Sequence, residues 1–184
     1  MVSSLRKLRL NASLLLGTFM DFQELLQVDS AVALNFFYSG LRDRAAAGRV
    51  TDDETLYVAS ILASYAQTSV SDTSSLPPLT DLSEVFDHFV LNRAILTDPE
   101  ILEIAGAQSM FLSGFFREQM RRRHTVNWFD SLGGSFYERA SVFSRSEKRR
   151  KLFGRVSQNF GVWAETCADL HRSLRENRFL LNPD

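Results

Sequence analysis

The residues of this sequence best suited to binding are the basic side chains between positions 117 and 155. Eleven lysines and arginines stand there against only four acids. A guanidinium group can form paired hydrogen bonds with a carboxylate or a phosphate, so the runs at 117–123 and 148–151 could together hold a phosphate or an acidic peptide. The candidate residues for binding a partner or an anion are Arg117, Arg121, Arg122, Arg123, Lys148, Arg149, Arg150 and Lys151.

Three interpretations of this basic region stay open. In the first, its charges are solvated or paired within the protein, where the acidic first half is the natural counterpart. Residues 1–100 hold seven Lys/Arg and thirteen Asp/Glu, whereas residues 101–184 hold fourteen and nine. In the second, an acidic protein partner pairs with them. In the third, they bind nucleic acid or anionic lipid, but the pI of about 6.3 disfavours this, since nucleic-acid-binding domains are commonly strongly basic.

The position of the second basic run also points to an acidic counterpart. Lys148–Lys151 fall in the first turns of a predicted helix, where cations meet the unfavourable end of the helix dipole.

No other pattern in the sequence indicates chemistry. There is no phosphate-binding glycine loop, nucleophile elbow or zinc motif. Glu84 and His88 stand one helical turn apart and could share a metal, but a helical metal centre needs such a pair on a second helix too. Cys167 lies on an apolar stripe, which favours a small buried hydrophobe over a reactive thiol. We therefore expect no catalytic centre, no cofactor and no metal.

The apolar spacing predicts the elements that must position these residues. It favours an all-α fold, a bundle of about six or seven helices, with residues 1–184 forming a single domain. A first helix is predicted over 4–27, and a second follows Asp29 as N-cap and ends at Gly48. Thr51 and Glu54 have the spacing of a capping box that opens a third helix. An exposed Ser/Thr/Pro loop is predicted at 68–78.

The second half of the chain gives the stronger helix signals. A helix is predicted to restart at 81–89, and Asp98 and Pro99 start another that runs toward Gly114. The apolar residues of 128–143, from Trp128 to Phe143, keep helical spacing, and Gly133-Gly134 within this segment marks a kink or a close backbone approach. A second capping box at 144–147 opens one long last helix. Its apolar seam consists of Phe153, Val156, Phe160, Trp163, Cys167, Leu170 and Leu174.

One segment has a resemblance to known proteins. It comprises Phe111-Leu112-Ser113-Gly114-Phe115-Phe116, Arg121-Arg122-Arg123, and Trp128-Phe129 through Gly133 to Tyr137. The segment, about residues 110–140, resembles part of a group of bacterial helical proteins of unknown function. The resemblance implies a bacterial helical protein and no particular activity.

The compartment is predicted to be the cytoplasm. The basic N-terminus and the apolar run 10–16 could begin a signal or transit peptide, but polar residues interrupt that run and no cleavage site follows before Asp21. No stretch approaches the roughly 18 apolar residues that a transmembrane helix needs. A single cysteine suits a reducing compartment.

These observations favour a non-catalytic interaction or regulatory protein. Its apolar seams and fifteen phenylalanines would serve a protein partner or a homodimer. Two alternatives stay open. One is a nucleic-acid- or anion-binding module that uses the basic region 117–155. The other is a small-ligand binder or an enzyme with a pocket between helices that leaves no linear motif.

Overall fold

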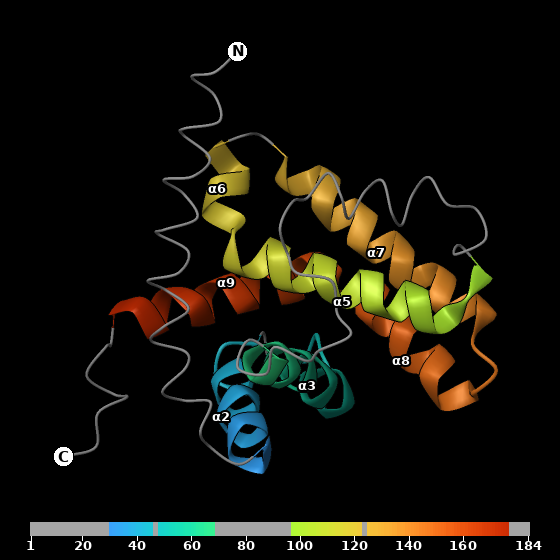
Figure 1. The fold of residues 1–184 in the computed structure, drawn as a ribbon, viewed down its shortest axis with the longest axis horizontal. Coiled ribbons are helices and arrows are strands. Elements are labelled where there is room, and N and C mark those ends of the chain that lie inside the picture. The colour runs from blue at the N-terminus through green and yellow to red at the C-terminus, as the bar shows by residue number, and fades with distance from the viewer. Residues whose placement is uncertain (1–29, 46–47, 69–96, 123–124, 177–184) are drawn as a thin grey trace.

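The computed structural model describes residues 30–45, 48–68, 97–122 and 125–176, and every regular element in these ranges is a helix (Figure 1). The helices are α2 (Ser30–Arg42), α3 (Asp52–Thr68), α5 (Pro99–Phe115), α6 (Arg117–Arg122), α7 (Val126–Phe143), α8 (Glu147–Gln158) and α9 (Phe160–Glu176). The predicted all-α fold is confirmed. The predicted helices at 4–27 and 81–89 and the predicted loop beyond Thr68 lie outside the described residues.

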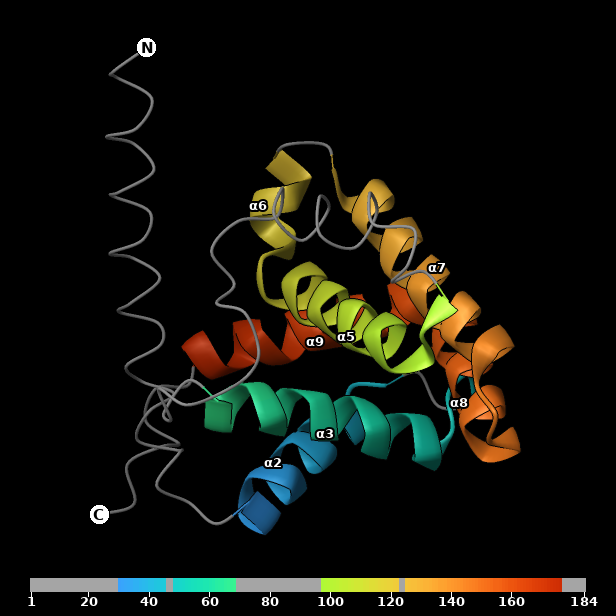
Figure 2. The same cartoon turned by 45° about the vertical axis from the view of Figure 1, so that its right-hand side comes forward.

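Helix α5 is the centre of the described fold. Ten of its residues, from Leu102 to Gly114, are buried, and they face several sides of the helix. A helix that is apolar all round must be covered on several sides. Helices α7 and α9 pack against it, and α3 contacts it while α2 packs against α3 (Figures 1 and 2). The predicted start of α5 is confirmed: Asp98 is the N-cap, its carboxylate accepts from the Glu100 N–H at 2.9 Å, and Pro99 follows.

Two glycines let neighbouring helices approach closely. A Cβ at Gly114 of α5 would lie 2.5 Å from the Cβ of Cys167 on α9. A Cβ at Gly133 of α7 would overlap the ring of Phe160. Helix α7 continues through Gly133 and Gly134 without a break, and the Ser157 hydroxyl donates to the Gly134 carbonyl at 2.8 Å. The prediction of a close approach at this glycine pair is therefore confirmed.

The predicted long last helix is wrong in two respects. First, Ser146 rather than Ser144 is the N-cap of α8: the Ser146 hydroxyl accepts from the Arg149 N–H, whereas Ser144 is the C-cap of α7. Second, the helix breaks at Asn159, which ends α8 and precedes α9. The apolar seam continues across the break. Its residues from Phe153 to Leu170 are buried, as predicted, and Leu174 packs against the core.

The end of the second helix also differs from the prediction. Helix α2 stops at Arg42, before Gly48. Gly48 nevertheless has the predicted left-handed conformation, with φ of 83°, and lies shortly before α3. Gly48 therefore lies in the loop between α2 and α3 and does not cap α2.

The carboxylate of Glu54 joins the start of α3 to the break between α8 and α9. Glu54 is 1% exposed. The predicted capping box is confirmed: the Thr51 N–H donates to Glu54 Oε2 at 2.9 Å, and the Glu54 N–H donates to Thr51 Oγ1 at 3.3 Å. Asn159 Nδ2 and Trp163 Nε1 both donate to Glu54 Oε1, at 2.8 and 3.4 Å. One buried side chain therefore accepts from Thr51, Asn159 and Trp163, and so joins the start of α3 to the point where the last helix is interrupted.

Replacing Glu54 with glutamine is expected to destabilise the protein by about 1 to 3 kcal/mol. The new amide group must face N–H or O–H donors on one of its two sides, so at least one buried donor loses its acceptor. Urea unfolding measures the loss. Asp53→Asn, an exposed carboxylate in the same first turn, is the matched control and should cost less than about 1 kcal/mol. Equal losses in the two variants would contradict the role given to Glu54.

Candidate functional site

The two basic runs lie at opposite ends of α7. Helix α6 carries Arg117, Arg121 and Arg122 and precedes α7, while the run 148–151 lies in the first turns of α8, after α7 (Figure 1). An 18-residue helix such as α7 is about 27 Å long. The structure therefore does not bring the two runs together into one site. Arg123 lies outside the described residues.

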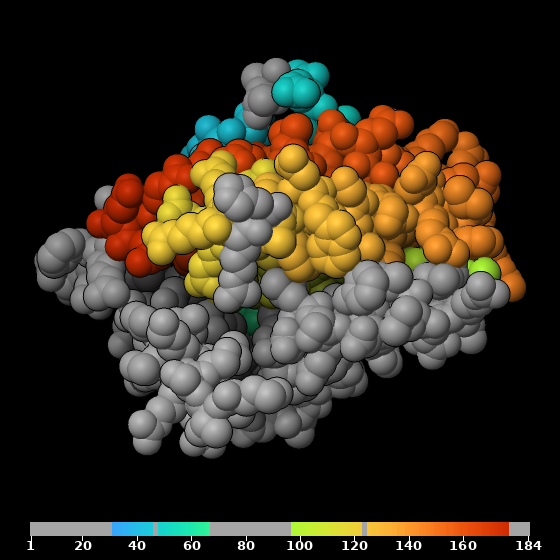
Figure 3. All heavy atoms as spheres, turned by 90° about the horizontal axis from the view of Figure 1, so that it is seen from above, coloured from blue at the N-terminus to red at the C-terminus, as the bar shows by residue number. Residues whose placement is uncertain are grey.

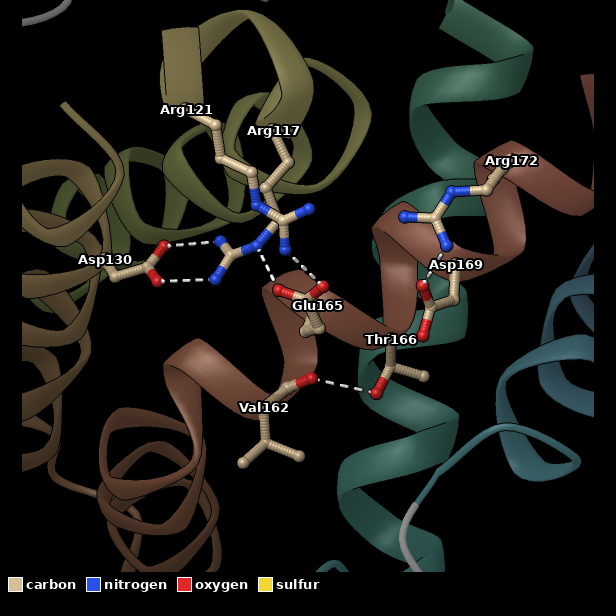
Figure 4. Close-up of polar contacts among 8 residues, drawn as sticks. All are labelled: Arg117, Arg121, Asp130, Val162, Glu165, Thr166, Asp169 and Arg172. Atoms are coloured by element: carbon tan, nitrogen blue, oxygen red, sulfur yellow. Dashed lines mark hydrogen bonds and ion pairs between the residues drawn. The ribbon is translucent and has the colours of Figure 1, made fainter. Parts of the chain in front are cut away.

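The first run contains a partly buried ion-pair network (Figure 4). Arg117 is 8% exposed and donates through both terminal nitrogens to the two carboxylate oxygens of Asp130, each at 3.0 Å. Its Nε donates to Glu165 at 2.5 Å, and Arg121 donates to the other Glu165 oxygen at 2.7 Å. These bonds tie α6 to α7 and α9.

The electrostatics keep this network charged. Burial lowers the pKa of Arg117, but the hydrogen bonds and charges of Asp130 and Glu165 outweigh it and hold the pKa above its ordinary value. Burial raises the pKa of Glu165, and the two arginines outweigh that effect and hold it below its ordinary value. Arg117 and Arg121 are thus paired internally and stabilise the fold.

The second run is only partly paired. Arg149 donates to Glu103 at 3.1 Å, and Lys151 forms an ion pair with Glu147 at 2.7 Å, one helical turn away. Lys148 and Arg150 are exposed and have no ion pair among the residues that the structure describes, and the same holds for Arg122 on α6.

The acids that pair with the basic region come from the same half of the chain. They are Glu103, Asp130, Glu147 and Glu165. Within the described ranges, none comes from residues 1–100; seven of the thirteen acids of the first half lie outside those ranges, so pairing between the two halves stays a prediction. Lys151 and Glu147 lie one turn apart on α8, and α6 packs against α7 and α9, which brings Asp130 and Glu165 next to the arginines of α6.

Large apolar side chains are exposed along α7. Val142 is 70% exposed, Trp128 46% and Phe143 40%. Helical spacing placed Trp128 and Phe143 on the apolar face, but that face is wider than the contact with α5, so only its central residues, such as Phe136 and Ala140, are buried. Val142 and Phe143 stand where α7 ends, immediately before the second basic run.

A cleft of about 340 Å³ lies between the α5–α6 junction and the C-terminal half of α9. Gly114, Phe115 and Arg121 line it from one side, and His171 and Arg175 from the other. The sequence did not indicate this cleft, because its two sides are about 50 positions apart and neither side carries a motif. The only hint was the seam residue Leu170, next to His171, which placed this turn of the helix beside the core.

His171 packs on Phe115, with ring centroids 4.7 Å apart. Burial and then the charge of Arg175 lower its pKa from 6.5 to about 4. The other charged groups that line the cleft around it are Arg117, Glu118, Arg121, Arg172 and Glu176.

Replacing His171 with phenylalanine is expected to flatten the dependence of stability on pH. The histidine has a lowered pKa in the folded protein, so it supports folding fully above about pH 6.5 and loses that support as pH falls toward 4. Phenylalanine keeps the ring contact and does not titrate. Urea unfolding at neutral pH and at about pH 4.5 should show a smaller loss in the variant. Equal losses in variant and parent would contradict the assignment.

Cys167 is a buried hydrophobe, as its place on the seam predicts. It is fully buried, and burial raises the pKa of its thiol to about 12. The thiol is therefore protonated at neutral pH and unreactive.

Comparisons with protein-family models, curated proteins and solved structures find no match for this chain. Within the described ranges, no helix is long and apolar enough to cross a bilayer. No three metal-binding side chains of the described residues gather in one place.

Proposed function

We propose that this protein is a non-catalytic interaction protein that binds an acidic protein partner at the tip of the α7–α8 hairpin, residues 142–150. The observation that supports the proposal is the pair Val142 and Phe143, exposed beside basic side chains that have no ion pair in the described structure. Helices α7 and α8 pack against each other, and the Ser141 hydroxyl donates to the Arg150 carbonyl at 2.9 Å, so the end of α7 lies next to the start of α8. Helix α7 forms much of the coloured surface in Figure 3.

The chemistry of the hairpin tip favours an acidic partner. Covering Val142 and Phe143 would remove apolar surface from water, which is the main gain in protein association. Lys148 and Arg150 stand in the first turn of α8, where the helix dipole disfavours cations. Carboxylates of a partner would relieve that cost, speed association and fix orientation.

Affinity purification from the native cell tests the proposal with three variants. Val142→Ser/Phe143→Ser and Lys148→Glu/Arg150→Glu alter the apolar and the basic part of the hairpin tip. Val32→Ser, on α2 and 53% exposed, is the matched control. We expect a stoichiometric acidic protein to be captured by the parent and by the control, and to be lost with both hairpin variants.

Other occupants would give different results. A homodimer would appear as a doubled mass in light scattering that the hairpin variants reduce to a monomer. Nucleic acid would copurify in a salt-dependent manner and would be lost with the charge variant alone. Either outcome, or a partner that all variants retain, would contradict the proposal.

A further inference from the structure

We propose a second binding site, for a small organic carboxylate, in the cleft between the α5–α6 junction and α9. This site goes beyond the proposed function, because its residues are separate from the hairpin tip. Three observations support it: the size and apolar lining of the cleft, the excess of arginines over acids in that lining, and the hydrogen-bond donors that these arginines leave unused.

The cleft has the size and lining of a small-ligand site. Its volume of about 340 Å³ lies at the lower end of the range that such pockets span, about 300–1,000 Å³. Gly114, Phe115 and Ala168 supply apolar lining. Arg121, Arg172 and Arg175 bring cationic groups to the same cleft from two helices. An apolar body with one anionic group fits this combination.

The arginines outnumber the acids that pair with them. Arg117, Arg121, Arg172 and Arg175 line the cleft. Asp130 and Glu165 pair with the first two, and Asp169 pairs with Arg172 at 3.0 Å (Figure 4). Arg175 has no ion pair in the part of the chain that the structure describes. Arg175 lines the same cleft as His171, and its positive charge, after burial, lowers the pKa of that histidine.

These arginines also retain donors for a ligand. A guanidinium group has five N–H donors and binds a carboxylate with two of them. The side chains of Arg121 and Arg172 are about half exposed, and each donates to one carboxylate in the described structure. A ligand carboxylate can therefore bond to them without breaking an existing ion pair.

Two acids in the lining influence which ligand charge the cleft prefers. Glu118 and Glu176 also line the cleft and are exposed. The lining therefore holds four arginines and two glutamates, and this small excess favours a singly charged carboxylate over a doubly charged phosphate. Neutralising Glu176 should strengthen anion binding.

The pKa of His171 provides a direct measure of ligand binding in the cleft. A carboxylate bound beside it has the opposite effect to Arg175, so benzoate should raise the pKa of His171 and increase the protonated fraction of its ring at about pH 5, where most benzoate is still charged. NMR titration of the histidine ring measures this shift. Benzyl alcohol, which has the same ring without the charge, should leave the pKa unchanged, and inorganic phosphate should bind more weakly than benzoate. An unchanged pKa with benzoate would overturn the proposal.

Calorimetry with benzoate tests the residues. Arg175→Gln should weaken binding by about tenfold, and Glu176→Gln should strengthen it several-fold. Arg155→Gln, an exposed residue of α8, removes the same charge outside the cleft and should have no effect. Equal weakening by Arg155→Gln and Arg175→Gln would show nonspecific attraction and overturn the proposal. Val142→Ser/Phe143→Ser should bind benzoate like the parent protein. The test of this site is therefore independent of the test of the hairpin tip.

Discussion

Replacing Arg117 with methionine is expected to lower the free energy of unfolding by about 3 kcal/mol, near the lower end of the range for breaking a buried ion pair. Methionine fills similar space but leaves the Asp130 carboxylate, 18% exposed, without its two hydrogen bonds. Glu165, 40% exposed, keeps Arg121 and recovers part of its solvation. The loss therefore comes mainly from Asp130.

Urea unfolding of three proteins separates this effect from a general loss of charge. Arg121→Met removes an arginine that bonds the same Glu165 but is about half exposed, and it should cost less than about 1 kcal/mol. The double variant Arg117→Met/Asp130→Leu should recover much of the loss, because no unpaired carboxylate is left at that position. A double variant no more stable than Arg117→Met alone would contradict the network.

The pH dependence of the free energy of unfolding shows whether the charge of Glu165 stabilises the protein. Its pKa is lowered in the folded protein, so its support is present above its ordinary pKa of about 4.3 and is lost as pH falls through the lower, folded value. The stability difference between the parent and Arg117→Met should accordingly narrow at strongly acidic pH.

Replacing Gly133 with valine is the second substitution with a large expected effect, about 2 to 3 kcal/mol. Any Cβ at this position overlaps the ring of Phe160, which is 2% exposed and cannot move into solvent. Valine adds two further methyl groups to that overlap. The better helix propensity of valine over glycine recovers only a few tenths of a kcal/mol.

Gly154→Val is the matched control, because it lies on the adjacent helix α8. A Cβ there meets only the hydroxyl oxygen of Ser141, at 3.4 Å. Thermal unfolding should show little change for this control and a clear decrease for Gly133→Val. Adding Phe160→Leu to Gly133→Val should cost less than Phe160→Leu costs alone. Additive losses would show that the ring contact is not the cause.

The sequence predicted two helix starts from local signals. Asp98 and Pro99, and Thr51 with Glu54, mark helix starts through bonds within one turn, and the structure has them as expected. The break at Asn159 was not predicted, and the hydrogen bond that the Asn159 side chain makes there goes to Glu54, 105 positions away. Ser144 and Ser146 both suit an N-cap, and only the end of α7 decides between them.

The candidate sites were predictable only in part. Residue type alone indicated the basic region, but its pairing depends on which acids the fold brings near, as Asp130 and Glu165 do for Arg117. The basic part of the hairpin tip, Lys148 and Arg150, was among the predicted candidates. Its apolar part was missed because helical spacing cannot tell how much of an apolar face a neighbour covers, as Phe143 illustrates. The cleft was missed because it joins two distant segments.

The bonds of Glu54 also bear on the order of folding. They close chain loops of more than 100 residues, to Asn159 and Trp163, whereas the α7–α8 hairpin forms between neighbours. Long loops cost more entropy to close, so these bonds should form after the rate-limiting step. Stopped-flow kinetics of Glu54→Gln should then show faster unfolding and a nearly unchanged refolding rate. We therefore expect the hydrogen bonds of Glu54 with Asn159 and Trp163 to form late in folding and to determine how long the native state persists before it unfolds.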